Sequence, residues 1–98
     1  MSDLENTIVS NAADILVNSF SKYNSEGEKI DKKVIGFWSK FKKRLDTSFV
    51  EGFEQSPVQY REKLIEVLLD LKSVQSVQFN MIMLLESQGY SIKDFENQ

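Results

Sequence analysis

Hydrophobic positions along the chain recur every three to four residues, which is the spacing of one face of an α-helix. The first such run consists of Leu4, Ile8, Ala12, Leu16 and Phe20. It is followed by Gly27, and a glycine at this point can adopt the left-handed conformation that ends many helices. We therefore predict a first helix over about residues 3–24.

A second run predicts a helix over about residues 28–46. Its apolar members are Ile30, Val34, Phe37, Trp38, Phe41 and Leu45. At about 100° per residue they lie within roughly 120° of arc, the width of a core-facing stripe. Aromatic residues at this spacing predict core, and the less favoured alternative is an exposed anchor. Trp38 lies at the edge of this arc, so among the three it is the one that we expect to be partly exposed. Gly36 costs this helix about 1 kcal/mol relative to alanine, and either close approach of a neighbouring helix or a kink would explain it.

A polar break at residues 46–48 precedes a short helix predicted over 48–54, with Ser48 as its N-cap. The next helix is predicted to begin at Pro57, because Ser56 can cap it and proline suits the first helical position. From there the apolar pattern continues to Leu85. One interpretation is a single long helix. The other is a break near Lys72, because residues 73–77 are poor to middling helix formers.

We favour the break, which gives helices over about 57–72 and 76–88 and a stop at Gly89. A short tail over 91–96 would form a last turn. Together these elements predict an all-α fold, a compact bundle of four to five helices in a single domain. The length of 98 residues fits one domain, and one proline is too few for a barrel or sandwich with many tight turns.

Composition removes several kinds of chemistry. The chain contains no cysteine and no histidine, so disulfides, thiolate metal sites and the commonest general base are excluded. No phosphate-binding loop, dinucleotide fingerprint, calcium loop or zinc spacing is present. We therefore expect no enzyme activity, no catalytic, cofactor-binding or metal-binding residues, and no small-molecule substrate.

Hydropathy bears on location. The longest apolar runs are four or five residues, too short to span a membrane. The first residues are acidic and have no basic region followed by an apolar core, so we expect no Sec-type signal peptide. A cytoplasmic location is the expectation.

Charge is strongly segregated. Residues 28–45 hold seven of the twelve basic residues and two of the fifteen acidic ones, a net charge of +5, whereas the rest of the chain carries −8. Segregated charge is typical of binding surfaces. The predicted partner-binding residues are Lys29, Lys33, Lys40 and Arg44 on one flank of the second helix, with Trp38 as a hydrophobic anchor. The ordinary alternative is a solvated face whose lysines cover the edges of the core.

The expected partner is a protein with an acidic surface, or a second copy of this chain, which would give a homo-oligomer. An anionic membrane or a nucleic acid is the less favoured alternative, because the segment contains one arginine and the rest of the chain is acidic. A further apolar run over residues 81–85 contains two methionines. It predicts either core or a groove for a partner helix, since methionine suits adaptable surfaces.

The order of features resembles the short α-helical effector-associated modules of bacterial conflict and immunity proteins. The matching features are Ala12-Ala13 in the first helix, Phe37-Trp38-Ser39-Lys40-Phe41-Lys42-Lys43-Arg44-Leu45, the Phe-x-x-x-Pro motif from Phe53 to Pro57, and the leucine-rich residues 61–69. The resemblance implies homotypic or adaptor binding that recruits or holds an effector. It leaves open a stand-alone adaptor and a domain of a larger protein.

The chain is also similar to the small secreted WXG-type helical hairpins. Tyr90-Ser91-Ile92-Lys93-Asp94 matches their Tyr-x-x-x-Asp/Glu export tail. Trp38-Ser39-Lys40, however, has no glycine where the hairpin turn of that family has one. Membership would imply a secreted helical protein.

Overall fold

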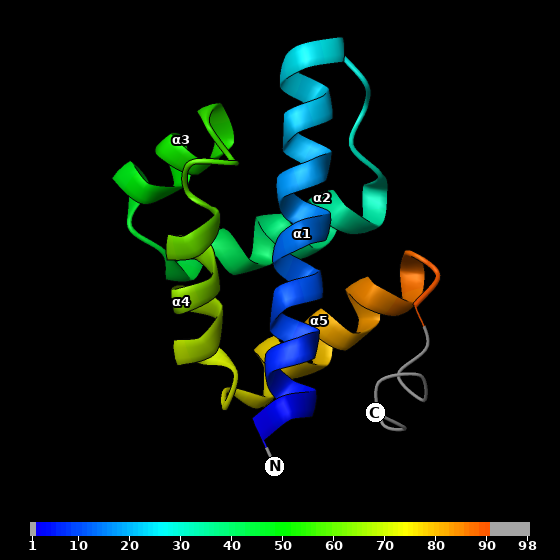
Figure 1. The fold of residues 1–98 in the computed structure, drawn as a ribbon, viewed down its shortest axis with the longest axis vertical. Coiled ribbons are helices and arrows are strands. Elements are labelled where there is room, and N and C mark those ends of the chain that lie inside the picture. Colours follow the sequence, from blue (N-terminus) through cyan, green and yellow to red (C-terminus); the bar gives the residue numbers. More distant parts are fainter. Residues whose placement is uncertain (1, 91–98) are drawn as a thin grey trace.

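A long helix, α1 (Ser2–Glu26), lies at the centre of the molecule and contacts each of the other four helices. The computed structural model describes the backbone of residues 2–90 and the side chains of residues 6–90 (Figure 1). Helix α1 ends beside Gly27, as predicted. Gly27 has a φ of +69°, and its N–H donates to the carbonyl oxygen of Tyr23 at 3.0 Å.

The other helices surround α1. They are α2 (Lys32–Phe41), α3 (Thr47–Gln55), α4 (Arg61–Leu71) and α5 (Gln75–Ser87). Helix α4 runs alongside α1, whereas α2 and α5 cross it (Figure 1). Residues 2–90 contain no strand, which confirms the predicted all-α bundle of a single domain. The radius of gyration is 12.9 Å, close to the value of about 13 Å usual for a compact domain of this length.

The core is entirely apolar among the side chains that the structure describes. Helix α1 supplies its centre with Val9, Ala12, Ala13 and Leu16, none more than 1% exposed. Aromatic side chains fill the space between α1, α2 and α3. Burial of apolar surface is the main driving force for folding, so this cluster carries much of the stability.

Helix α2 is shorter than the helix predicted over 28–46. It begins at Lys32 because the side chain of Asp31 caps it, accepting from the N–H of Lys33 at 2.7 Å. Residues 28–31 instead connect the left-handed turn at Gly27 to that cap. After Phe41 the chain tightens into a 3₁₀ turn, η1 (Lys42–Arg44), and Leu45 is extended.

The cap predictions around α3 are wrong, although its bounds lie within one residue of those predicted. Asp46 caps α3, and its side chain accepts from the N–H groups of Ser48 and Phe49. Ser56 ends α3 as its C-cap, with its N–H donating to the carbonyl oxygen of Gly52. Ser56 therefore does not open the next helix. Residues 57–60 form a turn, and α4 begins at Arg61 and not at Pro57.

The break in the long apolar pattern is observed. Helix α4 ends at Leu71, and Val74 is extended before α5 begins at Gln75. Helix α5 ends at the predicted stop at Gly89. The stop is a Schellman motif, because Gly89 has a φ of +92° and the N–H of Tyr90 donates to the carbonyl oxygen of Leu85. The predicted turn over 91–96 lies outside the described residues.

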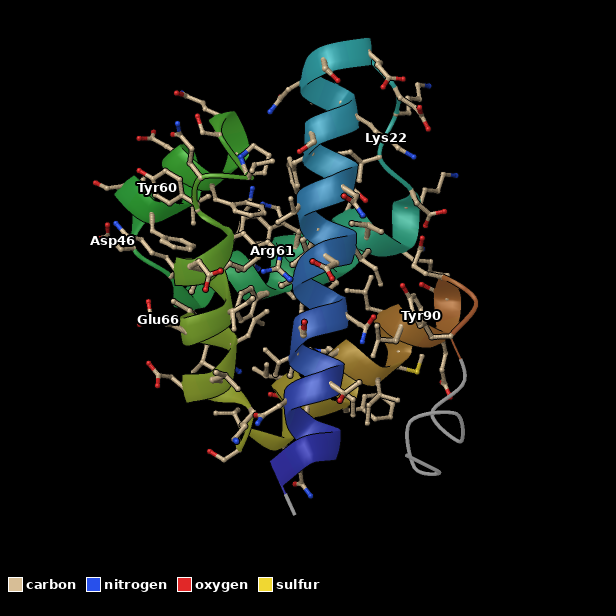
Figure 2. All side chains as sticks on the ribbon, viewed as in Figure 1. Lys22, Asp46, Tyr60, Arg61, Glu66 and Tyr90 are labelled. Carbon is tan, nitrogen blue, oxygen red and sulfur yellow. The ribbon has the colours of Figure 1, made fainter. Side chains whose placement is uncertain are left out.

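One ion pair attaches α4 to α1. The Arg61 Nε donates to the Asp14 Oδ1 at 2.8 Å, and Figure 2 shows Arg61 reaching from α4 towards α1. The hydrogen bond to Asp14 raises the pKa of the Arg61 guanidinium. Arg61 therefore links α4 to α1, and the charged side chains that α4 exposes are Glu62, Lys63, Glu66 and Asp70.

Candidate protein-binding groove

Helix α2 buries most of its apolar side chains and exposes its polar ones, with Ile35 as the exposed exception. Its buried residues are Val34, Phe37, Trp38 and Phe41, spaced by three or four positions so that they share one face. The other positions of the helix are exposed and include Lys33, Gly36 and Lys40. The helical spacing that builds the core therefore also places these three residues together on the outside, at intervals of three and four.

The exposed side of α2 borders a groove. Two adjoining hollows of about 560 Å³ and about 210 Å³ lie between α2 with η1 on one side and α5 on the other, and they share Phe37, Lys40 and Asn80. We call them the α2–α5 groove. Its residues that matter below are Lys33, Gly36, Lys40, Arg44, Phe79 and Met83.

The α5 wall of the groove exposes two large apolar side chains. Phe79 is 62% exposed and Met83 is 50% exposed. They are four residues apart, so they lie on one face of α5, which points away from the buried face formed by Val77, Met81 and Leu84. Phenylalanine and methionine side chains exposed side by side in a concave site are typical of surfaces that bind a partner.

The α2 side of the groove is basic. Lys33 and Lys40 are exposed, and neither forms an ion pair with any residue in the described part of the chain. Arg44 lies at one end, where its Nη2 donates to the Ser76 Oγ at 3.2 Å. Glu86 is the acidic residue among those lining the groove. The groove thus carries a net positive charge that intramolecular pairing does not neutralise.

Gly36 forms part of the groove surface between Lys33 and Lys40. The expectation of a closely approaching helix is wrong, because a Cβ added at Gly36 would have no neighbouring atom within 4 Å. Helix α2 continues through this position. The fold therefore gives no packing reason for a residue that costs about 1 kcal/mol in a helix interior. What Gly36 does provide is open space in the groove.

The two helix-interior glycines predict opposite responses to alanine. Gly36→Ala is expected to stabilise the protein by about 0.5–1 kcal/mol, because the helix gains propensity and nothing is displaced. At Gly52 an added Cβ would overlap the ring of Tyr60, which packs against Phe49. Gly52→Ala is therefore expected to cost about 1 kcal/mol, the overlap outweighing the gain in propensity.

Urea unfolding of the two variants measures this difference. Equal shifts of the midpoint in the same direction would contradict it. A destabilised Gly36→Ala protein would show that Gly36 has a packing role in the fold.

Two of the predicted partner-binding residues, Lys29 and Trp38, do not lie on the surface of this groove. Lys29 precedes α2, in the segment that follows Gly27, and so does not share a helical flank with Lys33. It lines a separate hollow of about 450 Å³, together with the exposed side chains of Tyr23 and Ile35. The structure thus places Lys33, Lys40 and Arg44 in one groove and separates Lys29 from them.

Trp38 is buried, so the expectation that it is partly exposed is wrong. It is 1% exposed, and its ring lies 5.0 Å from that of Phe53 and 5.6 Å from that of Phe20, centroid to centroid. Its Nε1 donates to the Glu54 Oε2 at 2.6 Å. The Lys42 Nζ lies 3.8 Å from the same oxygen. With its ring enclosed in this way, Trp38 has no surface with which to anchor a partner.

Sequence reasoning missed Phe79 and Glu54. Phe79 has a detectable signal, because Phe79 and Met83 are out of register with the stripe of Val77, Met81 and Leu84 that forms the core. The sequence signal for the role of Glu54 is weaker. A buried tryptophan usually finds an acceptor for its N–H, but the sequence does not indicate which carboxylate is within reach.

The described residues include no group of three or more acidic residues placed to hold a metal ion. Within residues 2–90, no helix has both the length and the apolar character needed to cross a bilayer. Trp38 lies inside α2 and not in an interhelical turn, so the WXG-type hairpin is not the architecture of this chain. The WXG export tail predicted from Tyr90 to Asp94 extends beyond the described residues.

Comparison with known proteins found no matching family model, no matching curated protein and no matching solved structure.

Proposed function

We propose that this protein is a non-catalytic interaction module that binds an acidic, amphipathic helix of a protein partner in the α2–α5 groove. The observation that carries the proposal is the exposure of Phe79 and Met83 opposite the unpaired lysines Lys33 and Lys40. Apolar side chains of a partner helix would cover Phe79 and Met83. Carboxylates flanking those side chains would face the lysines.

Physical reasons favour a helix as the occupant. A groove between two packed helices accepts a third helix through side chains spaced by three or four residues, a common recognition mode. Gly36 leaves space for a side chain of the partner between the two lysines. Opposite charge would guide encounter and orientation more than it would add affinity, because the lysines are exposed.

An adaptor role in a bacterial defence or regulatory system is the setting that the resemblance to effector-associated modules implies. In that setting the groove would recruit or hold an effector in the cytoplasm. Anionic membranes and nucleic acids remain the competing ligands. They are less favoured because Phe79 and Met83 lie in a concave site, and because the positive charge of the groove rests on a few side chains.

Binding of a synthetic helical peptide tests the proposal. The peptide carries leucines spaced by three or four residues with glutamates beside them, and its control carries lysines in place of the glutamates. Fluorescence anisotropy should show that the acidic peptide binds at least about tenfold more tightly than the control. Phe79→Ser and Lys40→Glu are each expected to weaken binding about tenfold.

Matched substitutions outside the groove control for general effects. Val58→Ser changes an apolar residue that is 69% exposed, and Lys22→Glu reverses an exposed lysine on α1. Both should leave the affinity unchanged. Failure of the acidic peptide to bind, or equal effects of groove and control variants, would overturn the proposal. Tighter binding to anionic vesicles or duplex DNA than to the peptide would also overturn it.

A further inference from the structure

The outer face of α4 has the chemistry that the groove requires. Glu62, Glu66 and Asp70 are exposed and spaced by four residues, so they form an acidic stripe along one side of the helix. Ile65 and Leu69 are half-buried beside this stripe. We call these five residues the α4 face.

Most of this negative charge is not neutralised within the molecule. Glu66 and Asp70 form no ion pair among the described residues, and Figure 2 shows Glu66 on the outer side of α4. Glu62 lies 3.7 Å from the Arg61 Nη1 at the start of the helix, where Arg61 is already bonded to Asp14. Lys63 is also exposed on this helix, but it forms no ion pair with these carboxylates among the described residues. Its Nζ lies over the ring of Tyr60, 5.5 Å from the ring centroid.

The spacings on the two surfaces correspond. At 1.5 Å per residue, Glu62 and Asp70 are separated by about 12 Å along α4, and Lys33 and Lys40 by about 10 Å along α2. Ile65 and Leu69 are separated by about 6 Å, as are Phe79 and Met83 on α5. The α4 face and the groove thus have similar separations between their charged side chains and between their apolar side chains.

We infer that the helix bound in the α2–α5 groove is α4 of a second copy of this chain. The inference rests on the proposed function and names the partner. The groove is formed by α2, η1 and α5, and α4 contributes no residue to it. Each copy therefore carries one donor face and one acceptor groove, and joining them head to tail leaves a free face and a free groove at the ends.

This geometry has a distinctive consequence. Association should not stop at a dimer, because every added copy offers a new groove. Sedimentation at low salt should show the average mass rising with concentration beyond that of a dimer. Raising the salt should reduce the association, since the pairing charges are exposed to solvent.

Two variants, each lacking one surface, provide the decisive test. The groove variant carries Lys40→Glu and Phe79→Ser, and the α4 variant carries Glu66→Lys and Asp70→Lys. Each alone should be monomeric, with self-association weakened at least about tenfold. An equimolar mixture should form a one-to-one dimer and nothing larger, because it contains one intact groove for each intact face. Helical circular dichroism and the fluorescence of Trp38 verify that both variants are folded.

The outcomes separate this inference from the proposed function. A wild-type protein that is monomeric at every salt concentration, yet binds the acidic peptide in its groove, would overturn self-association and leave the groove proposal standing. A monomer that also fails to bind the peptide would overturn both. Self-association that persists in either variant, or a mixture that remains monomeric, would also overturn the inference.

Discussion

Replacing Trp38 with alanine is expected to lower the free energy of unfolding by about 3–5 kcal/mol. The indole is 1% exposed and contacts the rings of Phe20, Phe41 and Phe53. Its removal leaves a cavity between three helices and deprives Glu54 of its N–H donor. Small domains have a total stability of only about 5–15 kcal/mol, so a large fraction of the variant should be unfolded on moderate heating.

Two further substitutions separate the causes of this loss. Trp38→Phe keeps most of the apolar contact and loses the hydrogen bond to Glu54, so it should cost about 1–2 kcal/mol. Phe79→Ala removes an exposed ring and should change stability by about 0.5 kcal/mol or less. Urea unfolding followed by circular dichroism measures all three variants. If Trp38→Ala were no more costly than Phe79→Ala, Trp38 would not be a core residue.

Leu16→Ala is expected to cost about 2–5 kcal/mol. Leu16 is fully buried in α1, the helix that contacts α2, α3, α4 and α5. Backbone packing around a central helix restricts how far the surroundings can collapse into the space left by the deleted atoms. The cavity therefore remains, and its cost adds to the lost transfer free energy.

Leu71→Ala is the matched control, because it deletes the same atoms from a half-buried position at the end of α4. It should cost about 1 kcal/mol, since less apolar surface is buried there. Thermal and urea unfolding of the two proteins give the comparison. Equal losses at Leu16 and Leu71 would contradict the central position of α1 in the packing.

The sequence predicted the helices where periodic apolar residues and glycine stops agree. Gly27 and Gly89 both adopt positive φ and end helices at the expected places. The interruption near Lys72 was also predictable, because weak helix formers follow it. The starts of α2, α3 and α4 were harder to predict. Asp31, Asp46, Ser48 and Ser56 are all competent caps, and tertiary packing decides which of them is used.

The burial of Trp38 was not predictable from α2 alone. A helical wheel places this side chain at the edge of the apolar arc, but the wheel does not show the neighbours. Phe20 from α1 and Phe53 from α3 approach Trp38, which brings the edge of the arc into the core. A residue at the margin of a stripe is buried or exposed according to elements that are distant in sequence.

The basic side of the candidate site was predictable from the charge pattern of the sequence, whereas its apolar side required the structure. The lysines were identifiable as a segregated cluster, although Lys29 departs from it because α2 begins later than predicted. The opposing wall depends on how α5 packs beside α2. That packing leaves Phe79 and Met83 uncovered, even though residues 81–85 read as a uniformly apolar run.

The core is complete without the groove. Phe79 and Met83 lie outside the buried cluster, and substitutions there should separate binding from stability. Trp38 and Leu16 have the opposite role, because they stabilise the bundle in which α2 and α5 pack against each other. Variants of the two kinds should therefore have independent effects on unfolding and on peptide affinity.

Chemical-shift mapping tests the central claim most directly. The acidic helical peptide is added to ¹⁵N-labelled protein, and the movement of each backbone amide signal is followed. The account predicts that the largest shifts fall in residues 33–44 and 76–87, which border the α2–α5 groove. Largest shifts around Tyr23, Lys29 and Ile30, which line the separate hollow, or no shifts at all, would contradict it.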